Sequence, residues 1–347
     1  MLEQADLFIS GSEGYHTFRI PALIATAKGT LLAFCEGRRS GGSDSGDIDL
    51  VLRRSIDGGQ TWSAIQKVWA DPGNTCGNPC PVVDRETGTI SLLMTHNLGT
   101  DIERKIIDGS SEGTRTVWLA RSSDDGETWD QPREITAATK EKNWTWYATG
   151  PGAGIQLAGG RLVVPCDHIE MTTNKYYSHV ILSDDGGETW RLGGTTPTDQ
   201  VNECEVAELE DGRLLLNMRN YDPSQRARAY AYSNDEGESW SSLTRHPDLV
   251  EPICQASLRR LDSPDGTYFL FANPASASAR ENMTVRLSRD GGLSWPVSRT
   301  LYPGPAAYSC LAILPDGRIA CLYELGEQRP YEKLRLAFFD LDWLNAM

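Results

Sequence analysis

The chain lacks long apolar runs and carries little positive charge for its size. No stretch of its 347 residues approaches the ~18 consecutive apolar residues of a membrane-spanning helix, so we expect no membrane partner. Its 33 basic residues face 48 acidic ones, which gives a net charge of -15. Because phosphate binding needs a basic face, this balance also argues against a nucleic-acid partner.

Patterns that bind metals or form disulfides are missing as well. The five histidines form no cluster with metal-ligand spacing, and none of the eight cysteines belongs to a CxxC pair. We therefore expect no cofactor and no metal, and we expect buried free thiols, with disulfides as the alternative. Residues 1–10 have neither a basic segment nor a long apolar one, so we expect a cytoplasmic protein as the sequence is written, and a periplasmic or secreted one if it was trimmed.

One eight-residue pattern, Ser-x-Asp-x-Gly-x-Thr/Ser-Trp, occurs five times. Each copy predicts a turn, because Gly accepts a positive φ, Asp and Ser can bind nearby backbone N–H groups, and Trp can pack as an apolar plug. The pattern resembles the Asp box, which occurs in β-propellers of unrelated function, so it indicates a fold and not an activity. The copies, called boxes below, span 55–62, 122–129, 183–190, 233–240 and 288–295.

A second repeat, a glycine turn followed by an apolar run, predicts hairpins. It occurs after Gly29, Gly88, Gly160, Gly212, Gly266 and Gly317. Six hairpins and five boxes predict an all-β fold, a six-bladed β-propeller of four-stranded antiparallel sheets, with residues 1–347 forming one domain. In the first blade we expect strands at 18–26, 30–35, 48–53 and 67–69. We expect 97–116 to be a long loop and 334–339 to be a late strand of the last blade.

The strand order also predicts where a site would lie. Strands alternate in direction within a blade, so the start of the first strand, the end of the second and the start of the third share one end of the propeller. The boxes are expected at the opposite end. Seven polar residues from four blades are expected to converge at the first end: Arg19, Asp44, Glu203, Arg219, Arg280, Tyr308 and Glu324.

Several of these residues stand in motifs similar to those of a known family. The boxes together with 18–21 (FRIP), 202–204 (NEC), 216–220 (LNMRN) and 307–310 (AYSC) resemble the exo-α-sialidases, or neuraminidases, over nearly the whole chain. The resemblance implies a retaining glycosidase that removes terminal α-linked sialic acid from glycoconjugates through a covalent tyrosyl intermediate. Sialylated glycans would then be its partners.

The resemblance also implies roles for single residues. Arg19, Arg219 and Arg280 would bind the substrate carboxylate, which planar guanidinium groups can hold with two hydrogen bonds each. Tyr308 would be the nucleophile and Glu203 the base that takes its proton, since a free phenol has a pKa near 10.

Asp44 would be the acid/base residue for the leaving oxygen and for water. Its place nine residues before Arg53 matches the family loop, and Asp47 and Asp49 are its rivals. Glu324 would hold Arg19 in place.

Other assignments stay open. Glu205 and Glu208 are rivals of Glu203, and Asp101 is a candidate contact to substrate hydroxyls. Arg38 either supports the three arginines or braces the Asp44 loop, and His168 is as good a candidate for a structural hydrogen bond as for a site residue.

Two other functions remain as alternatives. The same mechanism could act on another 2-keto-3-deoxy sugar acid, Kdn or Kdo, because the residues for the carboxylate and the chemistry would be the same. A carbohydrate-binding propeller without turnover is the alternative from a different class, but a pure binder has no need of a Tyr308–Glu203 pair.

Overall fold

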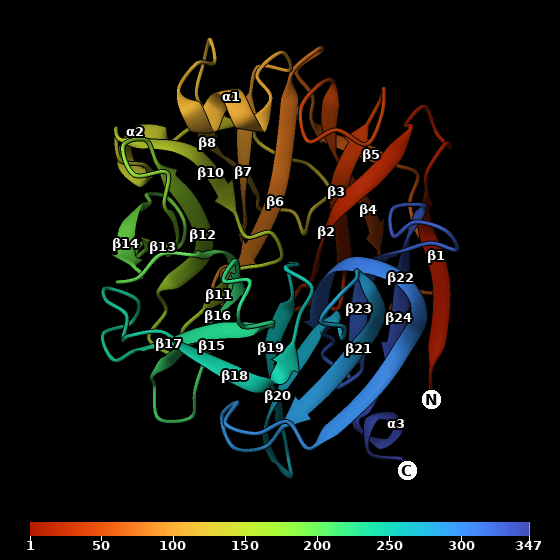
Figure 1. The fold of residues 1–347 in the computed structure, drawn as a ribbon. Coiled ribbons are helices and arrows are strands. Elements are labelled where there is room, and N and C mark those ends of the chain that lie inside the picture. The colour runs from red at the N-terminus through yellow and green to blue at the C-terminus, as the bar shows by residue number, and fades with distance from the viewer. Residues whose placement is uncertain (347) are drawn as a thin grey trace.

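The computed structural model of the protein describes residues 1–346, and β-strands dominate it (Figure 1). The strands form antiparallel sections of four, as the sequence predicts. Two sections are separate sheets in the middle of the chain, and a short strand, β11, pairs with β12 in the first of them. Their strands are β10 (Trp144–Thr149), β11 (Ile155–Gln156), β12 (Leu162–Glu170), β13 (Tyr176–Ser183) and β14 (Arg191–Thr195), then β15 (Val201–Glu208), β16 (Leu214–Asn220), β17 (Ala227–Ser233) and β18 (Thr244–Val250).

A larger sheet near the N-terminus joins two such sections. Within the part of the chain that the structure describes, the two sections are joined by a single parallel strand pairing, that of Ile48 in β4 with Thr75 in β6. The first section has the four predicted strands, with bounds that differ from the prediction by at most three residues. The strands are β2 (Thr17–Ala25), β3 (Leu31–Arg38), β4 (Ile48–Ser55) and β5 (Gln66–Trp69), then β6 (Thr75–Val83), β7 (Ile90–Asn97), β8 (Thr116–Ser122) and β9 (Arg133–Glu134).

The last sheet brings both ends of the chain together. Its strand β22 has 17 residues, and its first half pairs with β21 while its second half pairs with β23. The N-terminal strand β1 pairs with β24 at the edge, which the sequence analysis did not predict because only Phe8 of this strand is buried. The strands are β19 (Ser257–Ser263), β20 (Gly266–Pro274), β21 (Glu281–Ser288), β22 (Val297–Ile313), β23 (Ile319–Leu325), β24 (Lys333–Phe339) and β1 (Glu3–Ile9).

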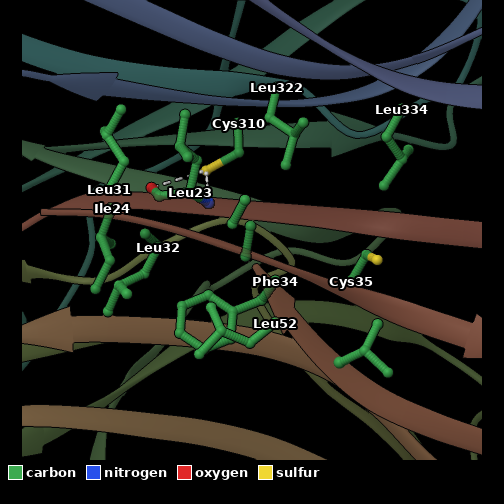
Figure 2. Packing of buried hydrophobic residues seen from close by; sticks show 14 of the residues in the cluster. Leu23, Ile24, Leu31, Leu32, Phe34, Cys35, Leu52, Cys310, Leu322 and Leu334 are labelled. Carbon is green, nitrogen blue, oxygen red and sulfur yellow. Dashed lines mark hydrogen bonds between the residues drawn. The ribbon is translucent and has the colours of Figure 1, made fainter. Parts of the chain in front are cut away.

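The core lies between neighbouring sheets. Strand β3 is buried at every residue, because its sheet is covered on both faces. Leu23 from the first sheet and Leu322 from the last belong to one buried cluster, and the Leu23 backbone N–H contacts Cys310 Sγ at 3.2 Å (Figure 2). All eight cysteines are buried and free, as predicted.

The box turns pack each four-stranded section against a neighbouring section. In the second box, Asp124 Oδ1 accepts hydrogen bonds from Ser122 Oγ at 2.8 Å and from the Thr128 backbone N–H at 2.9 Å. Gly126 has φ +79°, and a Cβ there would lie 2.6 Å from the Leu32 side chain, so both the turn and the packing require glycine. Equivalent bonds occur around Asp57, Asp185, Asp235 and Asp290.

Strand register places the boxes away from the predicted site. In the first section, Thr17, Arg38 and Ile48 lie side by side at one end, while Ala25, Leu31 and Ser55 lie at the other. An eight-residue strand such as β4 spans roughly 24 Å, so the first box and the Asp44 loop lie far apart.

The segment 97–116 was expected to be a long loop, but the structure shows more than a loop there. It contains a helix, α1 (Glu103–Asp108), which ends at Gly109 in a left-handed conformation. Six residues are too few to show a helical period in the sequence. The other helices in residues 1–346 are α2 (Thr136–Thr139) and α3 (Leu341–Asn345), and none of the three is long and apolar enough to cross a membrane.

The second box makes a prediction about stability and pH. Hydrogen bonds from the Thr128 hydroxyl and backbone N–H lower the pKa of Asp124 to about 2. A carboxylate with a lowered pKa stabilises the fold above its unfolded pKa of about 4 and loses that contribution as the pH falls toward 2. We expect Asp124→Asn to lower the urea midpoint at pH 7, with a deficit that shrinks between about pH 4 and pH 2.

Urea unfolding followed by tryptophan fluorescence at a series of pH values measures this deficit. Asp130→Asn is the matched control, because Asp130 is exposed and its carboxylate accepts no hydrogen bond from residues 1–346. A deficit for Asp124→Asn that stays constant with pH would contradict the prediction.

Candidate active site

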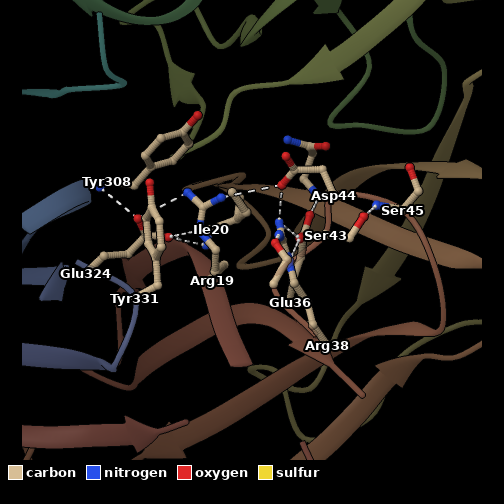
Figure 3. Close-up of polar contacts among 12 residues, drawn as sticks. Arg19, Ile20, Glu36, Arg38, Ser43, Asp44, Ser45, Tyr308, Glu324 and Tyr331 are labelled. Atoms are coloured by element: carbon tan, nitrogen blue, oxygen red, sulfur yellow. Dashed lines mark hydrogen bonds and ion pairs between the residues drawn. The ribbon is translucent and has the colours of Figure 1, made fainter. Parts of the chain in front are cut away.

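Charged and aromatic side chains from several sheets meet in one pocket. They lie at the strand ends opposite the boxes, and Figure 3 shows the part around Arg19, Asp44 and Tyr308. The pocket is lined by Arg19, Ile20, Glu36, Arg38, Asp44, Asn78, Glu103, Arg115, Trp146, Ala148, Asp167, Asn202, Glu203, Arg219, Tyr221, Arg280 and Tyr308.

Bulges in the first strands of the sections aim side chains into this pocket. The pairing register shifts near the site end of β2, β6, β10, β15 and the second half of β22. Such an irregularity bends a strand and redirects its side chains. The residues at these shifts that line the pocket are Arg19, Ile20, Asn78, Trp146, Asn202, Glu203 and Tyr308.

Arg19 is held by Glu324, as the resemblance implies. The Glu324 carboxylate accepts hydrogen bonds from Arg19 Nε at 3.0 Å and Nη2 at 3.3 Å, and from the backbone N–H groups of Ile20 and Tyr308 at 3.0 and 3.1 Å. Glu324 is completely buried and lies below the pocket lining. It therefore fixes an arginine and the predicted nucleophile together.

Asp44 lies between two guanidinium groups at the pocket mouth. Its Oδ1 is 2.7 Å from Arg38 Nη2 and 3.4 Å from Arg19 Nη1 (Figure 3). Partial desolvation opposes ionisation, but the charges of Arg38 and Arg19 outweigh it and hold the pKa of Asp44 below its usual value. Arg38 also donates to the Gly42 carbonyl at 2.7 Å, so it braces the Asp44 loop.

The carboxylates of Asp47 and Asp49, the rivals of Asp44, point away from the pocket. Asp49 accepts hydrogen bonds from Tyr15 at 2.7 Å and Arg39 at 2.6 Å, and Asp47 lies 3.7 Å from Arg39. Neither carboxylate is part of the pocket lining. Of the three, the structure brings only Asp44 to the other predicted site residues.

Tyr308 and Glu203 are in direct contact. The Tyr308 hydroxyl donates a short hydrogen bond to Glu203 Oε1, and Arg219 Nη1 donates to Glu203 Oε2 at 2.6 Å and to the Tyr308 oxygen at 3.1 Å. Burial and the charge of Glu203 raise the pKa of Tyr308 well above 10, against the opposing charges of the arginines. The phenol therefore keeps its proton, with an acceptor already in place.

Arg280 completes the arginine trio, which consists of Arg19, Arg219 and Arg280, and Tyr331 lies beside it. Arg280 lies over the Tyr308 ring at 5.6 Å and donates to the Tyr331 hydroxyl at 2.8 Å. The Tyr331 ring lies 4.2 Å from the Arg19 guanidinium. Tyr331 could not be predicted from the sequence, because a tyrosine in the turn before β24 carries no signal of its own.

The pocket holds nearly balanced charges. Among the described residues that line it, five arginines face five carboxyl groups. Burial and the nearby charge of Glu203 raise the pKa of Asp167 well above its usual value, and burial and the charge of Asp44 raise the pKa of Glu103. Because these shifts oppose two of the five negative charges, the local balance of charge differs from the net charge of -15 over the whole chain.

Several pocket residues were not predicted from the sequence. Glu103 comes from the unpredicted helix α1, and Asn78 and Trp146 come from bulges. Arg115 lies just before β8, donates to Asn78 Oδ1 at 2.6 Å and lies 4.0 Å from the Trp146 ring. Two pocket residues without a predicted role did carry a signal: Asn202 stands in the 202–204 motif, and Asp167 follows the apolar part of its strand.

Three candidates lie outside the pocket. The predicted contact of Asp101 with substrate hydroxyls is corrected, because Asp101 does not line the pocket. Its two carboxylate oxygens accept hydrogen bonds from the backbone N–H groups of Glu112 and Gly113 and so hold the loop after α1. His168 contacts His179 at 3.0 Å, and burial lowers its pKa to about 3, which indicates a structural role. Glu208 accepts from the Ala158 backbone at 2.9 Å at the far end of β15.

Glu205, the other rival of Glu203, lies buried beneath the pocket. It accepts hydrogen bonds from Ser257 at 2.9 Å, from the Leu258 backbone at 2.6 Å and from Arg259 at 3.1 Å. These donors use its carboxylate for packing the sheets together. No group of His, Cys, Asp and Glu within residues 1–346 has the arrangement of a metal site.

Comparison with known proteins identifies the family. A family model described as a BNR repeat-like domain matches residues 29–321. The chain is 37% identical to a sialidase of Micromonospora viridifaciens over 99% of this chain and 54% of that protein, and 35% identical to an exo-alpha-sialidase of Aspergillus fumigatus over 81% and 70%. The solved structure of the Hadza microbial sialidase Hz136 superposes with a TM-score of 0.90 at 30% identity, covering 98% of this chain and 69% of that one.

The chain thus spans little more than half the length of the Micromonospora relative. The matched residues nevertheless include every strand from β3 to β22 and the first residues of β23. The relatives cover nearly all of this chain at identities well above those that indicate a fold alone. Together these findings show that the chain belongs to the sialidase family with BNR repeats.

Proposed function

We propose that the protein is an exo-acting, retaining sialidase that hydrolyses terminal α-linked sialic acid through a covalent tyrosyl intermediate. The observation that carries the proposal is the Tyr308–Glu203 hydrogen bond inside the arginine trio. Two relatives named sialidase and exo-alpha-sialidase support the substrate class.

The arginine trio suits a substrate that carries a carboxylate on its anomeric carbon. Arg19 and Arg280 lie over the Tyr308 ring at 5.0 and 5.6 Å, and Arg219 donates to the Tyr308 oxygen. A carboxylate held by these guanidinium groups would place the adjacent anomeric carbon close to that oxygen. A neutral phenol also avoids the repulsion that a carboxylate nucleophile would feel from an anionic substrate.

Glu203 would take the phenol proton as the Tyr308 oxygen bonds to the anomeric carbon. Its second carboxylate oxygen stays paired with Arg219 at 2.6 Å, which keeps Glu203 oriented. Water would then release the sugar from Tyr308 in a second displacement, so the anomeric configuration is retained. A tyrosine nucleophile is a recognised exception to the two-carboxylate scheme of glycosidases.

Asp44 would protonate the leaving oxygen and later take a proton from water. The pKa of Asp44 is lowered by Arg38 and Arg19, which lie beside it. A substrate carboxylate that pairs with Arg19 would weaken this attraction and raise the pKa of Asp44. Substrate binding would thereby prepare the acid for its step.

The proposal includes the six-bladed propeller with five Asp boxes. Six antiparallel sections of four strands within residues 1–346 support it, two as separate sheets and four as halves of the larger sheets. The close packing of the box glycines against a neighbouring section, described for Gly126 and Leu32, fits blades that pack around one axis.

A substrate panel read by NMR tests the proposed function. We expect release of N-acetylneuraminic acid from its 4-methylumbelliferyl glycoside and from sialyllactose, with the α-anomer appearing first. Cleavage of only the Kdn or Kdo glycoside would show that the assigned substrate is wrong. Appearance of the β-anomer first would overturn the retaining mechanism. Binding without turnover of any member would favour the carbohydrate-binding alternative.

Removing the nucleophile should abolish turnover without unfolding the protein. We expect Tyr308→Phe to lower kcat on the order of 10³-fold or more, because the covalent step loses its oxygen. Tyr268→Phe is the matched control, since Tyr268 is buried at the opposite end of its sheet. Near-native turnover by Tyr308→Phe would show that the nucleophile is misassigned.

The acid role of Asp44 predicts a dependence on the leaving group. We expect Asp44→Ala to lower kcat/KM for sialyllactose by about 10²–10⁴-fold, because its alkoxide leaving group needs a proton. The loss for the 4-methylumbelliferyl glycoside should be much smaller, because that phenol leaves as an anion. Initial rates on both substrates decide the matter, and equal losses would contradict the assignment.

A further inference from the structure

One wall of the pocket carries acceptor oxygens that no protein group satisfies. Asp167 on β12 is 1% exposed and Asn202 on β15 is 7% exposed, and both line the pocket. No described residue donates a hydrogen bond to either Asp167 oxygen or to Asn202 Oδ1. Buried polar groups in proteins are nearly always paired, so three free acceptors at one wall require an explanation.

The two residues lie on strands that pack together. Cys204 Sγ donates to the Cys166 carbonyl at 3.4 Å. Cys166 directly precedes Asp167, and Cys204 is two residues after Asn202. The Asn202 side-chain amide donates to the Tyr221 hydroxyl at 3.3 Å, which leaves its oxygen free. The negative charge of Glu203 is the main charge acting on Asp167, so the wall lies close to the proposed reaction centre.

Neighbouring cations are already engaged elsewhere. Arg115 donates to Asn78 and lies over Trp146, and Arg219 pairs with Glu203. No ion pair joins Asp167 to any cation in the described part of the chain. Asp167 therefore faces the pocket as an unpaired carboxyl, and burial raises its pKa.

A structural role would give Asp167 donors of its own. The other buried carboxyls have them: Asp101 accepts from two backbone N–H groups, and Glu205 accepts from a hydroxyl, a guanidinium and backbone groups. An unpaired buried polar group lowers stability, so its presence points to a partner that arrives with a ligand.

We propose that Asp167, with Asn202 beside it, is a specificity-determining residue that accepts a hydrogen bond from a hydroxyl or amide donor of the bound sugar acid. The proposal rests on the proposed function, because it assumes a sugar acid whose carboxylate lies on the arginine trio. The donor-bearing parts of that sugar are its C4 hydroxyl, its C5 substituent and its hydroxylated three-carbon tail. A site built to bind such a donor rejects analogues that lack it.

Binding measurements identify the donor without requiring turnover. Isothermal titration gives Kd values for four free ligands with the wild type and with Asp167→Ala: N-acetylneuraminic acid, its 4-deoxy analogue, Kdn, and an analogue with the tail shortened by periodate and borohydride. We expect Asp167→Ala to weaken binding of N-acetylneuraminic acid about tenfold or more. The loss should fall to about twofold or less for the one analogue that lacks or changes the bound donor.

Two controls separate a ligand contact from a structural role. Asp167→Asn keeps one acceptor oxygen at the same position, so it should lose less affinity than Asp167→Ala. Thermal unfolding of Asp167→Ala should occur at the wild-type temperature or above it, because an unpaired buried carboxyl is removed. Asp101→Ala, which removes a carboxyl with two donors, should lower the unfolding temperature.

The outcomes distinguish this proposal from the proposed function. An equal loss for all four ligands, no loss, or a marked fall in thermal stability would overturn the role of Asp167 while leaving sialidase activity standing. A ligand-selective loss in a protein that cleaves no sialoside would uphold Asp167 and overturn the hydrolase. Absence of binding for every ligand would overturn the role of Asp167, and absence of both binding and turnover would overturn the hydrolase as well.

Discussion

The carboxylate of Glu324 is the group on which the rest of the pocket depends. It is completely buried, and four donors surround it: two from the Arg19 guanidinium and one each from the Ile20 and Tyr308 backbones. A buried charge is tolerated only with this degree of pairing, and removing one partner is costly. Because its donors come from β2 and β22, the same carboxylate sets the distance between an arginine of the trio and Tyr308.

The fold separates repeated from unrepeated chemistry. The boxes repeat along the chain and fasten sheet to sheet at one end, where Asp, Ser, Thr and Gly satisfy one another within a turn. The other end carries residues that occur once each, on strands that bulge as they enter the pocket. Stability and chemistry therefore occupy opposite ends of the same strands, and the site can vary without changing the turns that hold the sheets.

Much of the fold could be predicted from the sequence, because the boxes and glycine hairpins are local signals. The predicted strands of the first section lie within three residues of those observed. Strand β1 and helix α1 could not be predicted, since one is mostly exposed and the other is too short for a period.

The site was predictable where a residue stood in a motif, at a strand end or in the loop between the second and third strands of a section. Arg19, Glu203, Arg219 and Tyr308 were found in this way, and the structure brings them together. Asn78, Trp146 and Tyr331 were missed, because bulges and turn contacts depend on partners far away in the chain. Asp101 was overvalued for the reverse reason, since a strand-end aspartate looks the same in sequence whether it faces a ligand or caps a loop.

The separation of Arg19 and Glu324 by 305 residues has a consequence for synthesis of the chain. Ribosomes deliver Arg19 long before its buried counter-charge, Glu324. Early sheets can pair as they emerge, because their contacts are local, but contacts of such long range form slowly and late. Until β23 appears, Arg19 lacks the buried Glu324 carboxylate that fixes its guanidinium, and the nascent protein has no finished pocket.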